Sequence, residues 1–478
     1  MHMKKTSLLL IITFLLGACN KFLDVKPEDR LLEDQVYSTE TGINTAINGA
    51  YVRMGGDGLY GGNLTMSAAE VMGQQYNLSN ISHIWGDLGR YNYGSDNVKS
   101  TFTTIWSEAY KGILQLNAFI PKLAGTQNVL SAANKKLLIG EAYGLRAMLH
   151  FDLLRIFGPV YSTDPNALSI PYYTAAVATA NDLLPAHAVL DKVLLDLDSA
   201  TLYLHDDPLT TGGLQESSVL DGSNFYRYRR IHMNYFAVEA LRARVMLYAG
   251  RKAEALSLAE SVITAAGNYF PWTPRSATTD GNDPDKVFSS EVIFGVQNLD
   301  LYSQFNLFFA STLLANSILA PLDQRLMNAY ENNENDYRFG PWWKLPTSGG
   351  KDYRTFFKYD DPGPNSTGIK RYLQPLIRIT EMYYIAAETQ TDPVKALQYL
   401  NTVRLNRGLA DLPAGANLQN ALQLEYQREF YGEGQLFFYY KRNAAATIPN
   451  GSSVSGSLSM TALQYVVPLP LSETQYRQ

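Results

Sequence analysis

The fold is decided by two helical segments that a single glycine joins. Residues 232–249 read HMNYFAVEALRARVMLYA, Gly250 follows, and residues 251–266 read RKAEALSLAESVITAA. Apolar side chains recur every three or four positions in both segments, which is the period of a helix with one buried face. Small side chains let antiparallel helices approach closely, so the stretch predicts a helix pair of the tetratricopeptide type. The small residues that would face each other are Ala237, Ala240, Ala243, Ala255 and Ala259.

The same helical spacing recurs through most of the chain, which predicts a mainly α fold. Asp392 and Pro393 show how one of these helices begins, because Asp is a favoured N-cap and Pro is favoured in the first turn. Gly408 is then the expected C-terminal stop. The further predicted helices cover residues 39–54, 102–123, 132–157, 182–204, 378–389, 393–407 and 418–431.

Two segments, 55–100 and 267–375, lack this period and are rich in Gly, Asn, Pro and aromatic residues. A short strand is predicted at 292–296. Long irregular segments in a helical chain are typical of functional regions. Aromatic rings offer a face to sugars, and amide side chains bond hydroxyl groups; core packing is the alternative role for each ring. The candidate ligand-binding residues are Tyr76, Trp85, Tyr91 and Tyr93, with Gln74, Gln75, Asn77 and Asn80 nearby, and then Trp272, Tyr302, Trp342 and Trp343.

The N-terminus has the pattern of an export signal. Lys4 and Lys5 precede an apolar run over residues 8–16, and Gly17-Ala18 precede Cys19. A charged start, a short apolar core and small residues before a cleavage site are typical of a signal peptide. The run is shorter than the roughly 20 apolar residues of a membrane span. We therefore expect residues 1–18 to be removed, Cys19 to carry a lipid, and residues 19–38 to form a tether to one domain over 39–478.

The composition argues against a nucleic-acid partner, a disulfide and a metal site. The formal net charge is −5, and removal of Lys4 and Lys5 with the signal makes it more negative, which argues against a nucleic-acid partner. Cys19 is the only cysteine, so no intramolecular disulfide is possible. The six histidines show no metal-ligand spacing. We expect no cofactor; acidic loops at 280–283 and 360–361 are at most weak candidates for Ca²⁺, since they lack the EF-hand spacing.

The sequence contains no convincing catalytic motif. Residues 56–61 read GDGLYG, which fits G-x-G-x-x-G, but a dinucleotide site needs a strand before it and a helix after it. No H-E-x-x-H or G-x-S-x-G occurs in the chain. A pair of glycosidase carboxylates among the 45 acidic residues stays open.

Distinctive sequence blocks are spread over the whole chain. They are CNKFLDVKP at 19–27, WSEAYKGI at 106–113 with Asn117, RAMLHFDL at 146–153 with Phe157-Gly-Pro159, EMYYIAAE at 381–388, LNTVR at 400–404, Arg428-Glu429, Glu433-Gly434 with Arg442, and Pro468-Leu-Pro470 with Glu473. Together these blocks resemble the SusD/RagB family of Bacteroidetes outer-membrane lipoproteins, and the first is similar to that family's mature N-terminus. Leu436 and Tyr439 depart from the family pattern, which indicates a separate branch.

The resemblance implies a fold with four tetratricopeptide-like helix pairs and an irregular ligand-binding face. It implies a lipoprotein on the cell surface that covers a TonB-dependent, SusC-like outer-membrane transporter and hands it glycan fragments, without being an enzyme. A peptide-binding member of the family is the alternative, and a lipid-anchored glycoside hydrolase and a pure protein scaffold are further ones. Charged residues on apolar helices need buried partners, so Arg146, Glu381, Glu388, Glu433 and Arg442 are predicted to form structural ion pairs. Trp106 and Tyr110 lie on an apolar helical stripe, so we expect them in the core.

Overall fold

A computed structural model describes residues 34–279, 281, 283–475 and 477. The predicted signal peptide, Cys19 and most of the predicted tether lie outside the described residues. Among the described helices, none combines the length and the apolar character that a membrane span requires.

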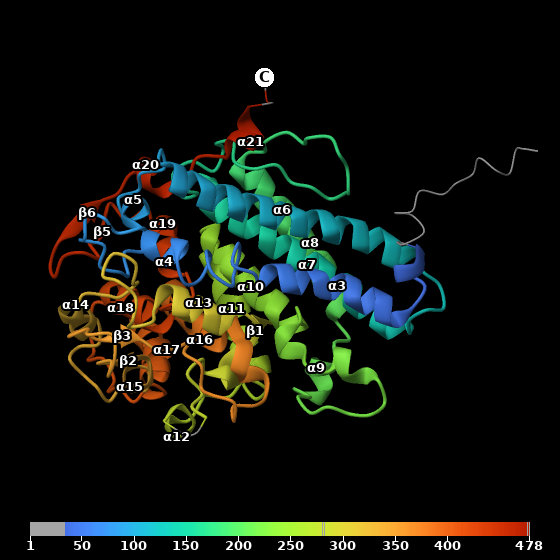
Figure 1. Cartoon of the computed structure of the whole chain (residues 1–478). Helices are drawn as coiled ribbons and strands as arrows, with labels where there is room; N and C mark the ends of the chain where they lie inside the picture. The colour runs from blue at the N-terminus through green and yellow to red at the C-terminus, as the bar shows by residue number, and fades with distance from the viewer. Residues whose placement is uncertain (1–33, 280, 282, 476, 478) are drawn as a thin grey trace, which may run out of the picture.

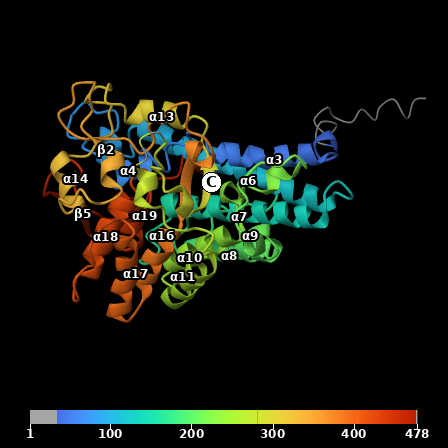
Figure 2. The same cartoon turned by 90° about the horizontal axis from the view of Figure 1, so that it is seen from below.

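The predicted mainly α fold is confirmed (Figure 1). Each long helix packs on the next long helix along the chain: α3 on α6, α6 on α7, α7 on α8, α8 on α10, α10 on α11, α11 on α16, and α16 on α17. Figure 2 shows this row from below, and its order is consistent with the predicted helix pairs. The bounds are α3 Glu40–Met54, α6 Asp96–Gly125, α7 Ala132–Phe157, α8 Ala186–Leu204, α10 Tyr235–Tyr248, α11 Lys252–Ala266, α16 Ile379–Thr389, α17 Pro393–Leu405, α18 Leu418–Glu429 and α19 Leu436–Arg442.

Helix starts differ from the predictions where the first turn is polar or follows a proline. Helix α6 begins at Asp96, before the predicted Phe102, because its first turn carries Lys99 and other polar residues that leave no apolar period. Helix α8 begins at Ala186, after the predicted Asp182, because Pro185 restricts the backbone before it. The start of α17 is as predicted, with Asp392 accepting from the backbone N–H groups of Val394 and Lys395.

Short strands and helices occur in the two irregular segments and in other connections between the long helices. The predicted strand is confirmed as β1 (Val292–Gln297), which pairs antiparallel with β4 (Leu373–Arg378). Two more antiparallel pairs are β2 (Trp343–Lys344) with β3 (Thr355–Phe356), and β5 (Thr447–Pro449) with β6 (Ser457–Ser459). The short helices are α4 Ala68–Met72, α5 Gly86–Gly89, α9 Pro208–Gly212, α12 Arg275–Thr278, α13 Leu301–Phe308, α14 Asp323–Ala329, α15 Phe339–Trp342, α20 Ala462–Tyr465 and α21 Leu471–Thr474.

One hydrophobic core runs through the molecule, from Ile43 in α3 to Val467 after α20. Helix α7 lies inside it, since nearly every residue from Leu137 to Phe157 is buried. The core therefore joins the helical row to the irregular segments.

The predicted structural ion pairs are confirmed. Each of the five charged residues singled out in the sequence meets an oppositely charged side chain that is buried or half-buried. The pairs are Arg146 with Asp196 at 2.6 Å, Glu381 with Arg244 at 2.6 Å, Glu388 with Arg442 at 2.5 Å, and Glu433 with Lys358 at 2.5 Å and Arg378 at 3.0 Å. Because a charge without a partner is costly in the core, these pairs fix how the helices meet.

The most connected of the buried charges is Glu429, the last residue of α18. Its carboxylate is fully buried and accepts from Arg338 at 2.7 Å and Arg407 at 2.6 Å. It also pairs with Arg378, the last residue of β4. Burial alone would raise the pKa of Glu429, but Arg378 and Arg407 outweigh that effect and hold it well below its ordinary value. One carboxylate thus holds α18, β4, the end of α17 and the turn before α15 together.

We predict that Glu429→Gln lowers the free energy of unfolding by about 3–5 kcal/mol, because the arginines would stay buried with a neutral partner. Urea unfolding followed by circular dichroism measures this. The control is Glu254→Gln, which removes an exposed pair with Arg251 and should cost less than about 1 kcal/mol. Equal effects of the two substitutions would contradict the role given to Glu429.

Candidate functional site

Two pockets flank the segment 77–90, in the first of the two predicted irregular segments. The first, called here the Tyr91 pocket, has a volume of about 450 Å³ and is lined by Gln74, Ser79, Arg90, Tyr91, Ser452 and Gln464 among others. The second, called the Asp323 pocket, has a volume of about 420 Å³ and is lined by Asn77, Ser79, Asn80, Leu322, Asp323 and Tyr353 among others. Ser79 lines both, so the two pockets adjoin. Each volume lies in the range of small-molecule sites.

Residues after α4, residues of α5 and residues of the hairpin of β5 and β6 line the Tyr91 pocket; these elements lie at the left of Figure 1. The backbone N–H of Leu78 donates to the Ser452 hydroxyl at 2.9 Å, and that of Gly451 donates to Gln74 Oε1 at 3.3 Å. A Cβ atom on Gly451 would lie 2.4 Å from the Tyr76 carbonyl oxygen, so only glycine fits there. The pocket wall therefore depends on close approach of two segments that are far apart in the chain.

Two residues of the Tyr91 pocket have left-handed backbone, which is uncommon outside glycine. Gln74 has φ of 58° and Tyr91 has φ of 57°. Each side chain bonds to the backbone near the other residue: Gln74 Nε2 donates to the Gly89 carbonyl at 2.9 Å, and the Tyr91 hydroxyl donates to the Met72 carbonyl at 2.6 Å. Strained backbone of this kind clusters at functional sites, which favours a ligand-binding role for this wall.

The Asp323 pocket is fixed by hydrogen bonds between segment 77–84 and segment 316–320. The N–H groups of Asn77 and Ile84 donate to the carbonyls of Ala320 at 2.8 Å and Asn316 at 3.0 Å. Asp323 lies at the start of α14, and Arg354 Nη1 reaches its two carboxylate oxygens at 3.0 and 3.2 Å. The pair keeps the Asp323 carboxylate oriented at the pocket wall.

Free hydrogen-bonding groups face this pocket. Asn77 and Asn80 use their side-chain oxygens to cap local turns, accepting from the N–H groups of Ser79 at 3.1 Å and Ser82 at 2.9 Å. In the described part of the chain their amide nitrogens have no partner, so both can donate to a ligand. The half-buried ring of Tyr353 adds an aromatic surface. Amide donors, a carboxylate and a ring together suit a ligand with hydroxyl groups and apolar C–H faces.

The first four predicted ligand residues lie near these pockets, at different depths. Tyr91 lines the pocket named after it. Tyr93 is half-buried, and its hydroxyl donates to the Gln464 carbonyl at 2.6 Å. Trp85 is half-buried against Phe308, with ring centroids 6.2 Å apart, and its buried indole N–H has no hydrogen-bond partner among the described residues. Tyr76 is buried below them and donates to the Met66 carbonyl at 2.5 Å; a ligand could reach its ring only after it is uncovered.

The other four lie elsewhere, so the structure does not bring the eight together. Trp342 and Trp343 are buried in an aromatic cluster around Phe356, where a ligand could reach their rings only after they are uncovered. Trp272 is half-buried against Tyr383 of α16, with ring centroids 5.1 Å apart. Tyr302 is half-buried in α13 and lines a separate cavity of about 30 Å³.

Sequence reasoning missed Asp323 and Tyr353. Both fall in the predicted irregular segment 267–375, where the candidates predicted from sequence are Trp272, Tyr302, Trp342 and Trp343. Gln74, Asn77 and Asn80 were noted as neighbours of the aromatic residues, and all three line the pockets. A search for amide and acidic residues in the second segment would have included Asp323.

A third pocket lies away from segment 77–90. It has a volume of about 280 Å³ and is more apolar, with Trp106, Tyr110, Tyr173 and Val177 in its wall. Trp106 is buried, as expected for a core residue, and Tyr110 is half-buried, with its hydroxyl donating to the Pro171 carbonyl at 2.8 Å. The few polar groups here make it a weaker match for a hydroxyl-rich ligand than the first two pockets.

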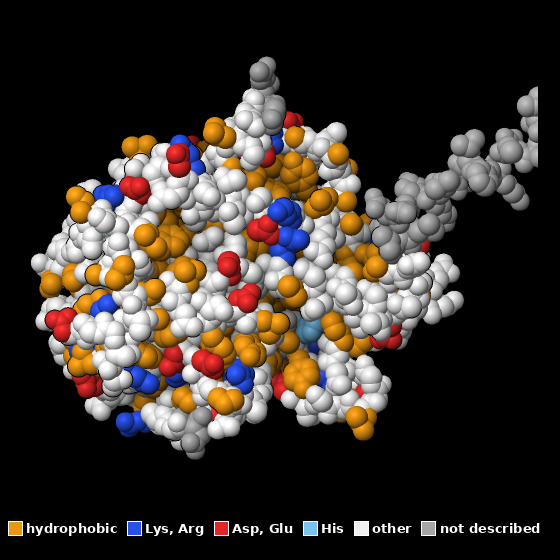
Figure 3. Space-filling view, viewed as in Figure 1, with side chains coloured by type: hydrophobic (Ala, Val, Ile, Leu, Met, Phe, Trp, Pro, Cys, Tyr) orange, Lys and Arg blue, Asp and Glu red, His pale blue; other side chains and the backbone are white. Residues whose placement is uncertain are grey.

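The surface charges are mixed, and the described residues form no evident metal site. On the face drawn in Figure 3, the acidic and basic side chains of the described residues are interspersed, without a continuous basic field. Among the described residues no group of three or more His, Cys, Asp or Glu side chains is placed to hold a metal ion. Asp280 and Asn282, in one of the weak Ca²⁺ candidates, lie outside the described residues.

Comparison with known families and structures places the chain. A family model described as "Starch-binding associating with outer membrane" matches residues 21–211, and the SusD/RagB model, described as "SusD family", matches residues 327–475. The chain belongs to the SusD/RagB family. A curated relative, SusD-like protein P2 of Formosa agariphila, is 27% identical over 213 residues, which is 43% of this chain and 39% of the relative. The chain thus matches about two fifths of that relative's length.

Solved structures share the SusD fold. A SusD superfamily protein from Bacteroides thetaiotaomicron aligns with a TM-score of 0.71 and 21% identity, over 92% of this chain and 98% of the other. A SusD-like carbohydrate-binding protein from Bacteroides vulgatus aligns with a TM-score of 0.64 and 19% identity, over 85% and 84%. A laminarin-binding SusD-like protein aligns with a TM-score of 0.63 and 17% identity, over 92% and 98%.

We predict that Gly451→Ala destabilises the protein by about 1–3 kcal/mol, because the added methyl group must push the Tyr76 and Gln74 carbonyls away. Urea unfolding gives the change, and limited proteolysis should show faster cleavage within 77–90. The control is Gly125→Ala, where a Cβ would meet nothing within 4 Å and stability should change by less than about 0.5 kcal/mol. If Gly451→Ala is as stable as the control, the close approach does not hold the pocket wall.

Proposed function

We propose that this SusD/RagB member binds glycan in the Tyr91 and Asp323 pockets and passes it to a TonB-dependent, SusC-like transporter in the outer membrane. The observation that carries the proposal is the lining of the two adjoining pockets. Free amide groups of Asn77 and Asn80, the Asp323 carboxylate and the Tyr353 ring offer what sugar hydroxyls and C–H faces need. Family membership supports the same ligand class, and one structural neighbour is described as laminarin-binding.

We propose binding without hydrolysis. A glycosidase needs two carboxyl groups, one of them able to give a proton to the leaving oxygen. Asp323 and Asp352 are the acids of the Asp323 pocket, and Asp323 is held in an ion pair with Arg354. The ion pair orients the Asp323 carboxylate, which can accept hydrogen bonds from sugar hydroxyl groups.

A contact with a transporter is supported by apolar side chains beside the pockets. Ile81 is 91% exposed, Ile84 54% and Leu314 72%. Ile84 and Leu314 lie on neighbouring segments, because the Ile84 N–H donates to the Asn316 carbonyl. Large apolar side chains grouped on a surface favour a protein-binding role. A partner bound here would lie next to the glycan, as handover requires.

Titration of the purified protein with a panel of polysaccharides and oligosaccharides tests the ligand class. We expect binding to at least one glycan, with starch and laminarin as first probes, and no release of reducing ends during incubation. Isothermal calorimetry measures the binding, and a reducing-sugar assay measures turnover. Binding to oligopeptides and to no glycan would favour the peptide alternative; release of reducing ends would favour a hydrolase.

The same titration locates the site. Asn80→Ala and Tyr353→Leu should each weaken glycan binding about threefold to tenfold, which corresponds to the loss of one hydrogen bond or one ring contact. The control is Tyr399→Phe, because Tyr399 lies on α17 and donates to Glu260 at 2.6 Å, away from the pockets. Unchanged affinity in both pocket variants would move the site elsewhere.

We also propose that Cys19 carries the lipid that holds the protein to the outer membrane. Cys19→Ser should abolish labelling by a fatty-acid analogue and move the protein from the membrane fraction to the aqueous fraction. Ser7→Ala, in the same leader, should change neither result. Membrane attachment that survives Cys19→Ser would contradict the lipid anchor.

A further inference from the structure

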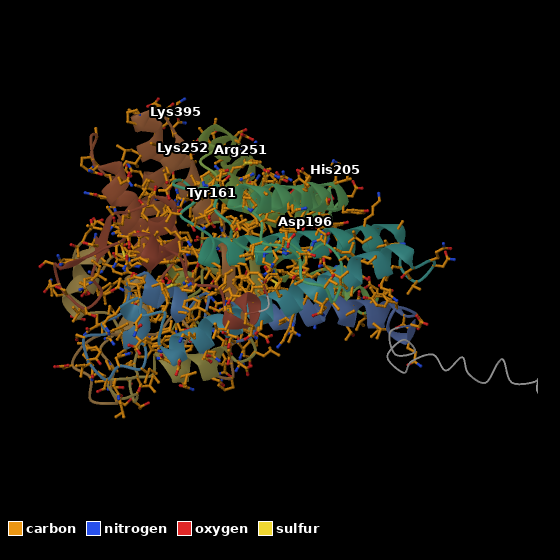
Figure 4. All side chains as sticks on the ribbon, turned by 90° about the horizontal axis from the view of Figure 1, so that it is seen from above. Tyr161, Asp196, His205, Arg251, Lys252 and Lys395 are labelled. Atoms are coloured by element: carbon orange, nitrogen blue, oxygen red, sulfur yellow. The ribbon has the colours of Figure 1, made fainter. Side chains whose placement is uncertain are left out.

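A small cavity lies where the C-terminal ends of α7 and α10 meet α19. Its volume is about 30 Å³, and its wall includes Arg155, Arg244, Tyr248, Tyr426, Gln435 and Arg442. Tyr161, which is labelled in Figure 4, lies next to the cavity wall: its ring centroid is 5.2 Å from that of Tyr248. The cavity is separate from the Tyr91 and Asp323 pockets, and the proposed glycan binding does not use it.

Two buried donors in its wall have no acceptor in the described part of the chain: Arg244 Nη1 and the Tyr248 hydroxyl. They are four residues apart on α10, so they lie on the same face of the helix. The other groups of Arg244 are occupied, with Nε and Nη2 each 2.6 Å from Glu381 and Nη2 also 2.8 Å from the Leu376 carbonyl. A buried donor without a partner costs about 1–3 kcal/mol, so the cavity needs an acceptor.

The arginines in the cavity wall are balanced by carboxylates. Asp152 pairs with Arg155, Glu381 with Arg244, and Glu388 with Arg442. Lys441, beside Arg442 in α19, is also buried, and in the described part of the chain no carboxylate pairs with it. Its ammonium donates to the carbonyls of Ile156 at 3.0 Å and Gly158 at 2.8 Å. Burial, with a further contribution from Arg155, lowers the pKa of Lys441 well below its ordinary value.

The chemistry of the wall favours an anion over water. The volume suits one or two water molecules, or one ion of similar size. A guanidinium can only donate, and each tyrosine hydroxyl has a hydrogen to donate. Among the described residues, no buried carboxylate or amide oxygen of the wall lacks a hydrogen bond, whereas Arg244 Nη1 and the Tyr248 hydroxyl both lack an acceptor. A halide ion only accepts, so it matches these two donors, one of which belongs to a charged guanidinium.

We propose that this cavity binds one small monovalent anion, of the size of chloride, between Arg244 Nη1 and the Tyr248 hydroxyl. Both donors belong to α10, and the cavity that holds the ion lies between α10, α7 and α19. It acts as a structural ligand, so it stabilises the folded chain by mass action.

Thermal unfolding of the full-length protein in sodium chloride and in sodium gluconate, at matched ionic strength, tests the proposal. Gluconate is too large for a cavity of about 30 Å³. The melting temperature should rise by about 1–2 °C for each tenfold increase in chloride above its Kd, and should not rise with gluconate. Equal behaviour in the two salts would overturn the proposal.

Tyr248→Phe removes the hydroxyl and keeps the ring. It should abolish the chloride-specific rise while Tyr161→Phe, on the neighbouring ring outside the cavity wall, keeps it. An unchanged chloride response in Tyr248→Phe would overturn the assignment. Crystals of the wild-type protein grown with bromide give a test that does not depend on a variant's folding: an anomalous peak in the cavity supports the site, and ordinary water density in its place overturns it.

Discussion

The Glu429 carboxylate, buried among Arg338, Arg378 and Arg407, is the interaction on which the rest of the structure depends. The four side chains come from the end of α18, the turn before α15, the end of β4 and the end of α17. None of these charges could stay buried alone, because desolvation of an isolated ion costs several kcal/mol. The helical row and the irregular segments must therefore meet in one arrangement, the one that brings all four together.

The candidate glycan site is built on this arrangement. The buried carboxylate of Glu70, in α4, accepts from the Gly434 N–H at 2.7 Å, and burial raises the pKa of Glu70 to about 8. Gln75 donates to the Gln427 carbonyl at 3.1 Å, in the helix that ends at Glu429. The segment that leads into both pockets is thus attached to α18 and to the turn before α19. Its two left-handed residues, Gln74 and Tyr91, can be held in strained backbone because this framework around them is rigid.

Aromatic residues serve mainly the core in this protein. One row of packed rings runs from Trp343 through Phe356 and Tyr431 to Tyr76, with the centroids of neighbouring rings 4.8 to 5.7 Å apart. The pockets instead take their character from amides, a carboxylate and single rings such as Tyr353. The candidate glycan site of this protein therefore rests on polar side chains held by turns, with few large rings.

The sequence was enough to predict most helices and the first strand, because helical periodicity is a local property. It was also enough to predict buried ion pairs, because a charge on an apolar helix requires a partner wherever it lies. It also located segment 55–100, with Asn77 and Asn80 in it. Only the tertiary structure decided which partner each charge takes, that Trp342 and Trp343 are buried, and that Tyr353 faces segment 77–80. These outcomes depend on contacts between residues that are far apart in the chain. Local sequence patterns do not show which surfaces become covered when the chain packs.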